Sequence, residues 1–223
     1  MLLWRVYNQL MNLLIFGDSI TWGAWDEEGG WAQRIKSFAD KKAATLNYDN
    51  YTSVYCLGVS GDNTFDLLKR FETEVRARID EEEKTLILIE IGINDSQLDL
   101  AEKQHRVSPE EYKQNLSKLI EISKKYQADI VFIGLTPVDD SLVDPIPWKP
   151  ECSYRLDFVQ KFDKTLKSVC NEQNIPYIEL MSKFIEKDFK TLLTDGLHPN
   201  TQGHKLTFEE VKKYLSEKGI MNF

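Results

Sequence analysis

Residues 13 to 23 read LLIFGDSITWG, and the interpretation of the whole chain starts from this stretch. Four apolar residues, Leu13 to Phe16, run directly into Gly17, Asp18 and Ser19. A buried strand that stops at a turn explains the pattern, because Gly, Asp and Ser favour turns. A strand that delivers a serine hydroxyl to the rim of a sheet explains it equally well. The rest of the chain has to separate these two interpretations.

Composition limits the class of protein. The chain has 223 residues, of which 42% are hydrophobic and 29% are charged, and this balance is typical of a soluble globular domain. The length suits one α/β domain with a substantial core. The net charge of −8 argues against a nucleic-acid partner, because phosphate backbones require a basic face.

The cysteines and the first residues bear on location. Three widely spaced cysteines without a CxxC pair favour a reducing compartment. No apolar run reaches the roughly 20 residues of a membrane span, and the first 16 residues lack a small-residue cleavage site. These features predict a cytoplasmic protein with an N-terminal extension at residues 1–10 and one domain at residues 11–223. No feature of the sequence indicates the oligomeric state.

Strand-like and helix-like segments alternate along the chain. Apolar runs predict five strands, and between them apolar residues recur at spacings of three and four, as in amphipathic helices. The expected strands are residues 12–16, 51–57, 86–91, 130–135 and 176–180. This alternation predicts a single α/β domain with a parallel sheet and helices on both faces. Two long connections, residues 92–107 and 136–152, are candidates for functional loops.

Polar clusters follow the predicted strands. Gly17-Asp18-Ser19 follows the first strand, Gly58 to Asn63 the second, and Gly92-Ile93-Asn94-Asp95 the third. The segment Asp195-Gly196-Leu197-His198-Pro199 comes shortly before the last helix. Because ligands of open α/β sheets bind beyond the carboxyl ends of the strands, we expect these groups to share one edge.

The residue types in these clusters suit acyl transfer. A serine nucleophile needs a base, and His198 can take the proton of Ser19. Asp195, three residues before the histidine, can fix the orientation of its ring. The side chain of Asn94 and the backbone N–H groups of Gly61 and Ser19 are candidate donors to the oxyanion of a tetrahedral intermediate.

Four segments in this order give the chain a resemblance to the SGNH, or GDSL, hydrolase superfamily. They are FGDSIT, LGVSGDNT, IGINDS and DGLHPN. The resemblance implies a flavodoxin-like three-layer sandwich with a five-stranded parallel sheet of order 2-1-3-4-5. It also implies that Ser19 is the nucleophile, His198 the base and Asp195 the residue that orients it. Gly61 and Asn94 would form the oxyanion hole together with the N–H of Ser19.

Several other polar residues have a structural interpretation. We expect Asp18 and Asp95 to hold loops through backbone N–H groups, and Ser60 to be a turn residue. His105 is interpreted as a solvated loop residue and His204 as a structural residue of the last helix.

Aromatic residues offer candidates for substrate binding. Trp148 lies in the proline-rich loop 136–152 and either lines the substrate site or pins the loop to the body of the domain. For Trp22, Trp25 and Trp31, core packing is favoured over a role in the acyl pocket.

These observations predict a serine esterase that acts on a small-molecule, short-chain acyl ester. A thioesterase or lysophospholipase-like enzyme and a carbohydrate deacetylase are the alternatives within this chemistry. A non-catalytic binding module is the alternative of another class. No cofactor is expected, because Gly58 to Asn63 lacks a GxGxxG pattern. No metal is expected either, because the acidic loop around Asp139 and Asp140 is interpreted as solvated.

Overall fold

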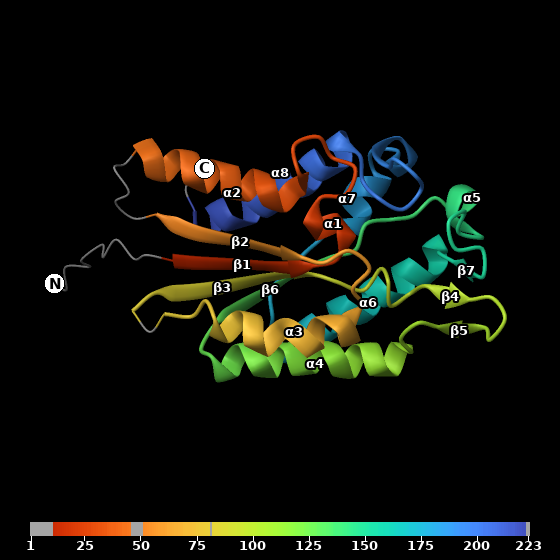
Figure 1. Ribbon diagram of the computed structural model, residues 1–223, viewed down its shortest axis with the longest axis horizontal. Helices are drawn as coiled ribbons and strands as arrows, with labels where there is room; N and C mark the ends of the chain where they lie inside the picture. Colours follow the sequence, from red (N-terminus) through yellow and green to blue (C-terminus); the bar gives the residue numbers. More distant parts are fainter. Residues whose placement is uncertain (1–10, 46–50, 81, 222–223) are drawn as a thin grey trace.

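The centre of the molecule is a five-stranded parallel sheet of order β2-β1-β3-β6-β8 (Figure 1). The computed structural model describes residues 11–45, 51–80 and 82–221, so the predicted extension at residues 1–10 lies outside it. Taken in chain order, the five strands follow the predicted 2-1-3-4-5 arrangement, which confirms the predicted fold class. The strands are β1 (Met11–Gly17), β2 (Thr52–Gly58), β3 (Lys84–Glu90), β6 (Asp129–Ile133) and β8 (Tyr177–Ile178).

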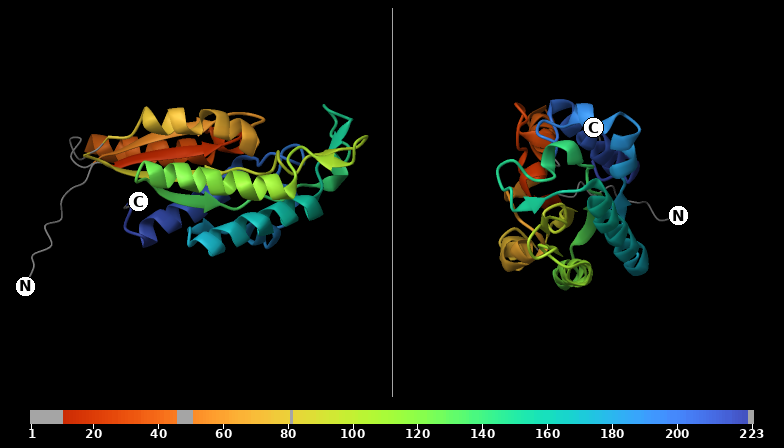
Figure 2. Two further views of the ribbon diagram at one scale, coloured as in Figure 1. Left: turned by 90° about the horizontal axis from the view of Figure 1, so that it is seen from below. Right: turned by 90° about the vertical axis from the view of Figure 1, so that its right-hand side faces the viewer.

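Helices cover both faces of this sheet (Figures 1 and 2). On one face lie α2 (Gly30–Thr45) and α8 (Thr201–Glu217), which contact each other. On the other face α4 (Pro109–Lys125) lies between α3 (Thr64–Arg76) and α6 (Leu156–Gln173). The shorter helices are α1 (Ser19–Trp22), α5 (Asp140–Val143), α7 (Met181–Ile185) and the 3₁₀ helix η1 (Phe189–Leu192).

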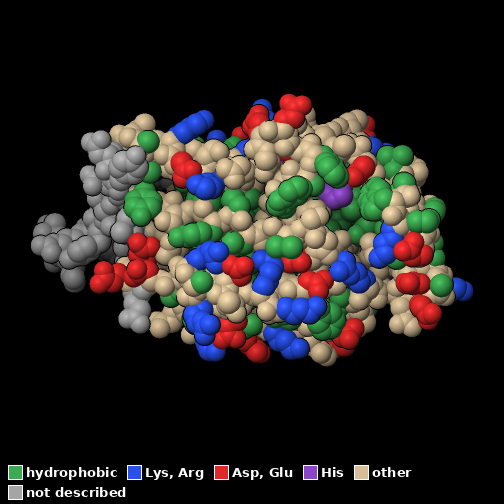
Figure 3. Space-filling model, in the orientation of Figure 1, with side chains coloured by type: hydrophobic (Ala, Val, Ile, Leu, Met, Phe, Trp, Pro, Cys, Tyr) green, Lys and Arg blue, Asp and Glu red, His purple; other side chains and the backbone are tan. Residues whose placement is uncertain are grey.

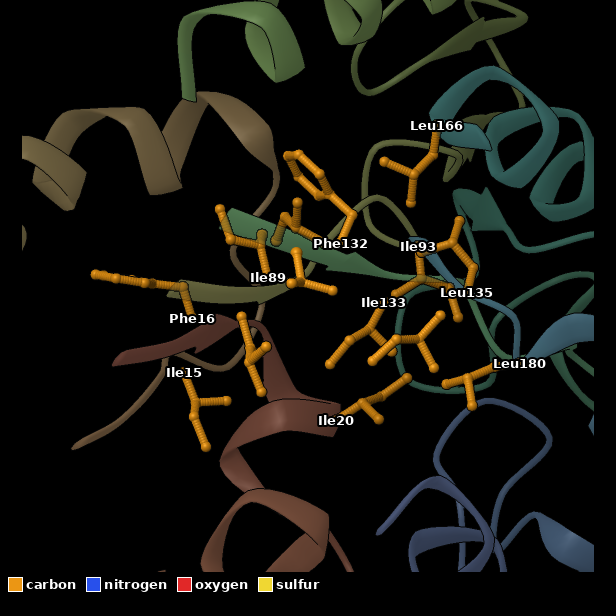
Figure 4. Packing of buried hydrophobic residues seen from close by; sticks show 14 of the residues in the cluster. Ile15, Phe16, Ile20, Ile89, Ile93, Phe132, Ile133, Leu135, Leu166 and Leu180 are labelled. Carbon is orange, nitrogen blue, oxygen red and sulfur yellow. The ribbon is translucent and has the colours of Figure 1, made fainter. Parts of the chain in front are cut away.

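The core forms around β1 because this strand has β2 on one side, β3 on the other, and helices above and below. Leu13, Leu14, Ile15 and Phe16 are all fully buried, so the apolar run is covered on both faces of the sheet. Figure 4 shows Ile15 and Phe16 on opposite sides of the strand, with Ile20 of α1 continuing the core towards the carboxyl edge. The carboxyl end of β1 is therefore fixed by packing before any polar contact is considered.

The two long connections join in a second, small antiparallel sheet that the sequence did not predict. It has the order β5-β4-β7 and consists of β4 (Leu98–Asp99), β5 (Gln104–His105) and β7 (Cys152–Ser153). Leu98 pairs with His105 on one side and with Ser153 on the other. This sheet extends beyond the carboxyl ends of the central strands (Figure 1).

The interpretation of His105 as a solvated residue is wrong. Its Nδ1 lies 2.9 Å from the carbonyl oxygen of Ser96, and its ring meets Phe158 and Phe162 edge-on at 4.8 and 5.2 Å. Pairing in β5 turns this side chain towards α6 and leaves it half-buried, and short two-residue strands of this kind leave no periodicity in a sequence.

The cysteines form no disulfide: Cys56 is exposed, while Cys152 and Cys170 are buried. Across residues 11–45, 51–80 and 82–221, no helix combines the length and the apolar character that crossing a bilayer requires. Within the same residues, no three His, Cys, Asp or Glu side chains gather as a potential metal site.

A buried acid, Glu90, ends β3 and connects the sheet to two helices. It is 2% exposed, and its Oε2 accepts hydrogen bonds from Thr21 Oγ1 at 2.9 Å and from Trp31 Nε1 at 2.8 Å. Its Oε1 is buried without a hydrogen-bond partner among the described residues. Burial raises the pKa of Glu90 to about 7, although the two hydrogen bonds oppose this effect.

We predict that Glu90→Gln stabilises the protein at alkaline pH. The folded state binds this proton more tightly than the unfolded chain, whose glutamate pKa is about 4.3. The tighter proton binding of the folded state stabilises the protein fully below the unfolded pKa of about 4.3. This stabilisation is lost as the pH rises through the folded pKa of about 7. The glutamine variant should show a free energy of unfolding about 1–3 kcal/mol above the wild type at pH 8 and little difference at pH 4. Urea unfolding at both pH values measures this. Glu82→Gln, at an exposed position, is the control, and an unchanged dependence on pH at Glu90 would contradict the prediction.

Candidate active site

Ser19 is the first residue of α1, directly beyond the end of β1. Asp18 caps this helix, because its Oδ1 accepts the N–H of Ile20 at 2.9 Å. Gly17 allows the sharp exit from the strand: a Cβ there would overlap Thr21 Oγ1 and lie 2.5 Å from the carbonyl oxygen of Glu90. The sequence Gly-Asp-Ser therefore positions a serine side chain at the edge of the sheet, at 6% exposure.

His198 lies on a tight turn that Asp195 stabilises. One carboxylate oxygen, Oδ1, accepts the backbone N–H of Leu197 at 3.0 Å and that of His198 at 2.8 Å. The N–H of Thr194 donates to the carbonyl of His198 at 2.8 Å and closes the turn. The cap of α8 is Asn200, so Asp195 belongs to the turn and to the histidine rather than to the helix.

Ser19, His198 and Asp195 form one continuous array, although Ser19 and His198 are 179 residues apart. Ser19 Oγ lies 3.0 Å from His198 Nε2, and His198 Nδ1 lies 2.8 Å from Asp195 Oδ2. Burial would raise the pKa of Asp195, but hydrogen bonds from the ring and backbone of His198 outweigh it and lower the pKa to about 2. Asp195 is therefore charged at any working pH and accepts the hydrogen of His198 Nδ1.

Asn94 is linked to Asp18, the residue before Ser19, and to Asp62, the residue after Gly61. Asn94 is 5% exposed, and its Nδ2 donates to the carbonyl of Asp62 at 2.9 Å and to Asp18 Oδ2 at 3.2 Å. Gly61 has φ of +82°, and a Cβ there would meet no protein atom within 4 Å. The glycine is thus required by its backbone conformation, and the space above it is open. Arg106 fixes the loop by donating to the carbonyl of Gly61 at 2.9 Å.

Two buried aspartates support these loops, which agrees with their predicted structural role. Burial, reinforced by the charge of Glu90, raises the pKa of Asp18 to about 8. Asp95 accepts the N–H of Thr64 with both oxygens at 3.1 Å, and burial raises its pKa to about 7. Asp18 is therefore largely neutral at pH 7.

Two tryptophans, Trp25 and Trp148, lie beside the array. Of the three tryptophans predicted to pack in the core, only Trp31 does so, and the prediction is wrong for Trp22 and Trp25. Trp31 is fully buried, but Trp22 and Trp25 are each 60% exposed. The Trp25 ring meets His198 edge-on, with the ring centroids 5.7 Å apart, and the Trp148 ring is stacked on that imidazole with centroids 6.4 Å apart and an interplanar angle of 29°. Figure 3 shows a histidine at the surface among hydrophobic side chains on this face of the molecule.

Trp25 also donates a hydrogen bond to the array, and sequence reasoning missed this contact. Its Nε1 lies 3.0 Å from Asp195 Oδ2 and 3.1 Å from His198 Nδ1. Because Nδ1 carries the hydrogen that bonds Asp195, the indole N–H is left to Asp195. His204, the predicted structural histidine, supports this loop: it is fully buried, and its Nε2 contacts the carbonyl of Ala24 at 3.1 Å. The only signal in the sequence was the closeness of Trp25 to the Gly-Asp-Ser segment.

A three-layer α/β sandwich with serine, histidine and aspartate joined at its carboxyl edge defines a hydrolase of the acyl-transfer type. The chain belongs to the GDSL-like Lipase/Acylhydrolase family, which it matches over residues 15–206. The prediction of a carboxylic ester hydrolase is thereby confirmed.

Known proteins resemble the chain over nearly its full length. A GDSL esterase/lipase of Arabidopsis thaliana is 28% identical, with 93% of this chain and 87% of the relative covered. The isoamyl acetate-hydrolyzing esterase of Saccharomyces cerevisiae is 24% identical, with coverage of 91% and 84%. Among solved structures, a lipase/acylhydrolase from Enterococcus faecalis has a TM-score of 0.71 at 21% identity, with coverage of 93% and 96%.

We predict that Trp25→Phe lowers kcat/KM for p-nitrophenyl acetate by about three- to tenfold. The change removes the N–H that donates to Asp195 and keeps an aromatic ring beside His198, and a hydrogen bond to a partly exposed charged group has an effect of this order. Trp22→Phe is the matched control, because Trp22 is equally exposed. Equal losses in the two variants would mean that the indole N–H of Trp25 has no role in orienting the array.

Proposed function

We propose that the protein is a serine esterase that cleaves small, short-chain acyl esters through an acyl-enzyme intermediate. The observation that carries the proposal is the continuous array from Ser19 Oγ through His198 to Asp195. This is the arrangement that activates a serine hydroxyl. A binding module without catalysis would have no need for the serine and the histidine to meet at 3.0 Å.

The proposed reaction begins when His198 Nε2 takes the proton of Ser19 and Oγ attacks the ester carbonyl carbon. The charged Asp195 stabilises the imidazolium that forms. His198 then returns the proton to the leaving alcohol, and the acyl group stays on Ser19. His198 then takes a proton from a water molecule, which attacks the carbonyl carbon of the acyl-enzyme. When the second tetrahedral intermediate breaks down, His198 returns the proton to Ser19 Oγ and the carboxylic acid leaves.

The tetrahedral intermediates would place their oxyanion among the backbone N–H groups of Ser19 and Gly61 and the side chain of Asn94. The 3.2 Å contact between Asn94 Nδ2 and Asp18 is the longer of its two, and a largely neutral carboxyl group is a weaker acceptor than an oxyanion. We infer that Asn94 exchanges this contact for the oxyanion and keeps the bond to Asp62.

The acyl group is proposed to be small, with acetyl esters of simple alcohols as the leading substrates. Relatives named for the hydrolysis of isoamyl acetate, from human and yeast, support this scope at 26% and 24% identity. A carbohydrate deacetylase is the second candidate, because Trp25 and Trp148 present exposed aromatic faces beside His198, and such faces suit sugar rings.

We propose a cytoplasmic location on the cysteine pattern of the sequence. A relative from Bacillus subtilis, 23% identical, is named an uncharacterized lipoprotein. Fractionation of the source cells, with an antibody against the protein, distinguishes a cytosolic from a membrane-associated enzyme.

The test of the proposed function is covalent labelling. A fluorophosphonate probe should form an adduct on Ser19, identified by mass spectrometry of the peptide, and p-nitrophenyl acetate should be turned over. Ser19→Ala should abolish both, and Ser60→Ala should leave both intact. Labelling at Ser60 would overturn the assignment of the nucleophile, and a wild-type protein without turnover or adduct would support a binding module instead.

Trp148→Ala should change the ranking of substrates by size. Trp148 is 55% exposed and lies against His198, so its removal opens the site on the side of the loop 136–152. We expect relative activity to shift from acetyl towards butyryl and octanoyl p-nitrophenyl esters, with a change of only a few degrees in Tm. Trp22→Ala is the control of similar exposure. An unchanged ranking with a lower Tm would mean that Trp148 pins the loop.

A further inference from the structure

A buried chain of hydrogen bonds leads from the small sheet to Asn94. Tyr154, 2% exposed and directly after β7, has its hydroxyl 2.6 Å from Asn94 Oδ1. The same hydroxyl lies 2.9 Å from Gln97 Nε2, and Gln97 Oε1 lies 3.0 Å from Lys149 Nζ. Two of these residues lie in the connection after β3 and two in the connection after β6, so the chain bridges both long loops.

The direction of each bond is fixed by chemistry at the two ends. The Lys149 ammonium can only donate, so it meets the oxygen of Gln97 and leaves the Gln97 NH₂ group facing Tyr154. The Tyr154 hydroxyl accepts that bond and therefore sends its single hydrogen to Asn94 Oδ1. At the other end, the carbonyl of Asp62 can only accept, and it takes a hydrogen from Asn94 Nδ2.

We propose that Tyr154 is a positioning residue of the oxyanion hole, whose hydroxyl holds the Asn94 carboxamide with its NH₂ group towards the reacting carbonyl, and that Gln97 and Lys149 set the direction of this bond. The inference rests on the proposed function, because it assigns Tyr154 a role through Asn94. A carboxamide can rotate by half a turn and exchange its oxygen for its nitrogen. With the oxygen turned inward, Asn94 would repel an oxyanion instead of stabilising it.

Burial favours this arrangement. Asn94, Gln97 and Tyr154 are each less than 8% exposed, so water does not compete for their hydrogen bonds. Burial, together with the nearby Asp18, raises the pKa of Tyr154 well above its ordinary value, so the hydroxyl keeps its hydrogen at any working pH. Pairing of β7 with β4 holds the backbone on both sides, with Ser153 opposite Leu98 and Cys152 opposite Asp99.

The experiment is a double-mutant cycle. Tyr154→Phe should lower kcat for p-nitrophenyl acetate about tenfold with KM within twofold, since the oxyanion forms only after the substrate is bound. Asn94→Ala alone should lower kcat by about 10²–10³-fold, as removal of one oxyanion donor does. Adding Tyr154→Phe to Asn94→Ala should change kcat by less than twofold. Activity is expressed per site titrated with the fluorophosphonate probe, so that misfolded protein does not count.

Two further variants separate positioning from stability. Tyr177→Phe is the matched control: it also removes a hydroxyl, one that donates to Asp163 at 2.8 Å, and it should lower Tm while leaving kcat unchanged. Gln97→Glu keeps the size of the side chain but leaves only acceptors facing Lys149 and Tyr154. It should draw the Tyr154 hydrogen away from Asn94 and lower kcat as Tyr154→Phe does.

The outcomes are distinct. The proposal is overturned if Tyr154→Phe lowers kcat less than threefold. It is also overturned if Tyr154→Phe lowers kcat by the same factor in the Asn94→Ala variant as in the wild type. A wild-type protein without esterase activity would instead reject the proposed function. In that case the side-chain ¹⁵N–¹H resonances of Asn94 still test the hydrogen bond, because they should shift on Tyr154→Phe and stay in place on Tyr177→Phe.

Discussion

The burial of β1 on both faces is the constraint on which the site depends. Because β1 is an interior strand buried on both faces, its apolar residues hold its carboxyl end at one position, and Gly17 lets the chain turn there against Thr21 and Glu90. Ser19 is thus placed by the core and not by a mobile loop. The histidine comes from the other end of the sequence, and its turn is held by bonds to Asp195. The 3.0 Å contact between Ser19 Oγ and His198 Nε2 therefore depends on two segments that are fixed independently, strand β1 and the turn at Asp195.

Two buried acids, Asp18 and Glu90, lie at the carboxyl ends of neighbouring strands and shape the electrostatics of this edge. Asp18 and Glu90 both have raised pKa values, to about 8 and about 7, because burial penalises their charged forms and the charge of Glu90 adds to the effect at Asp18. Asp195 has the opposite environment, with several N–H donors, and stays charged. Negative charge is therefore held at Asp195, which contacts the ring nitrogen of His198 opposite the one that contacts Ser19, and it is reduced at Asp18 and Glu90.

The sequence was sufficient for the sheet and for the residues at its edge, because both depend on local patterns. An apolar run followed by Gly-Asp-Ser is readable one strand at a time, and the carboxyl ends of parallel strands necessarily meet. His105 and Trp25 were misread because their surroundings come from distant segments: the first pairs in a two-residue strand, and the second reaches a turn 170 residues away. Composition and spacing carry no information about such contacts.

The small sheet β5-β4-β7 shows what such distant contacts contribute. It pairs the loop that holds Asn94 with the loop that holds Trp148. Lys149, at one end of the hydrogen-bond chain to Asn94, directly follows Trp148, whose ring lies against His198. Under the roles proposed for Trp148 and Asn94, a substrate that moves Trp148 would also move Lys149, and through Gln97 and Tyr154 it would affect the orientation of Asn94. In that proposal, substrate binding and transition-state stabilisation would be coupled through the segment from Trp148 to Tyr154, without any change at Ser19 or His198.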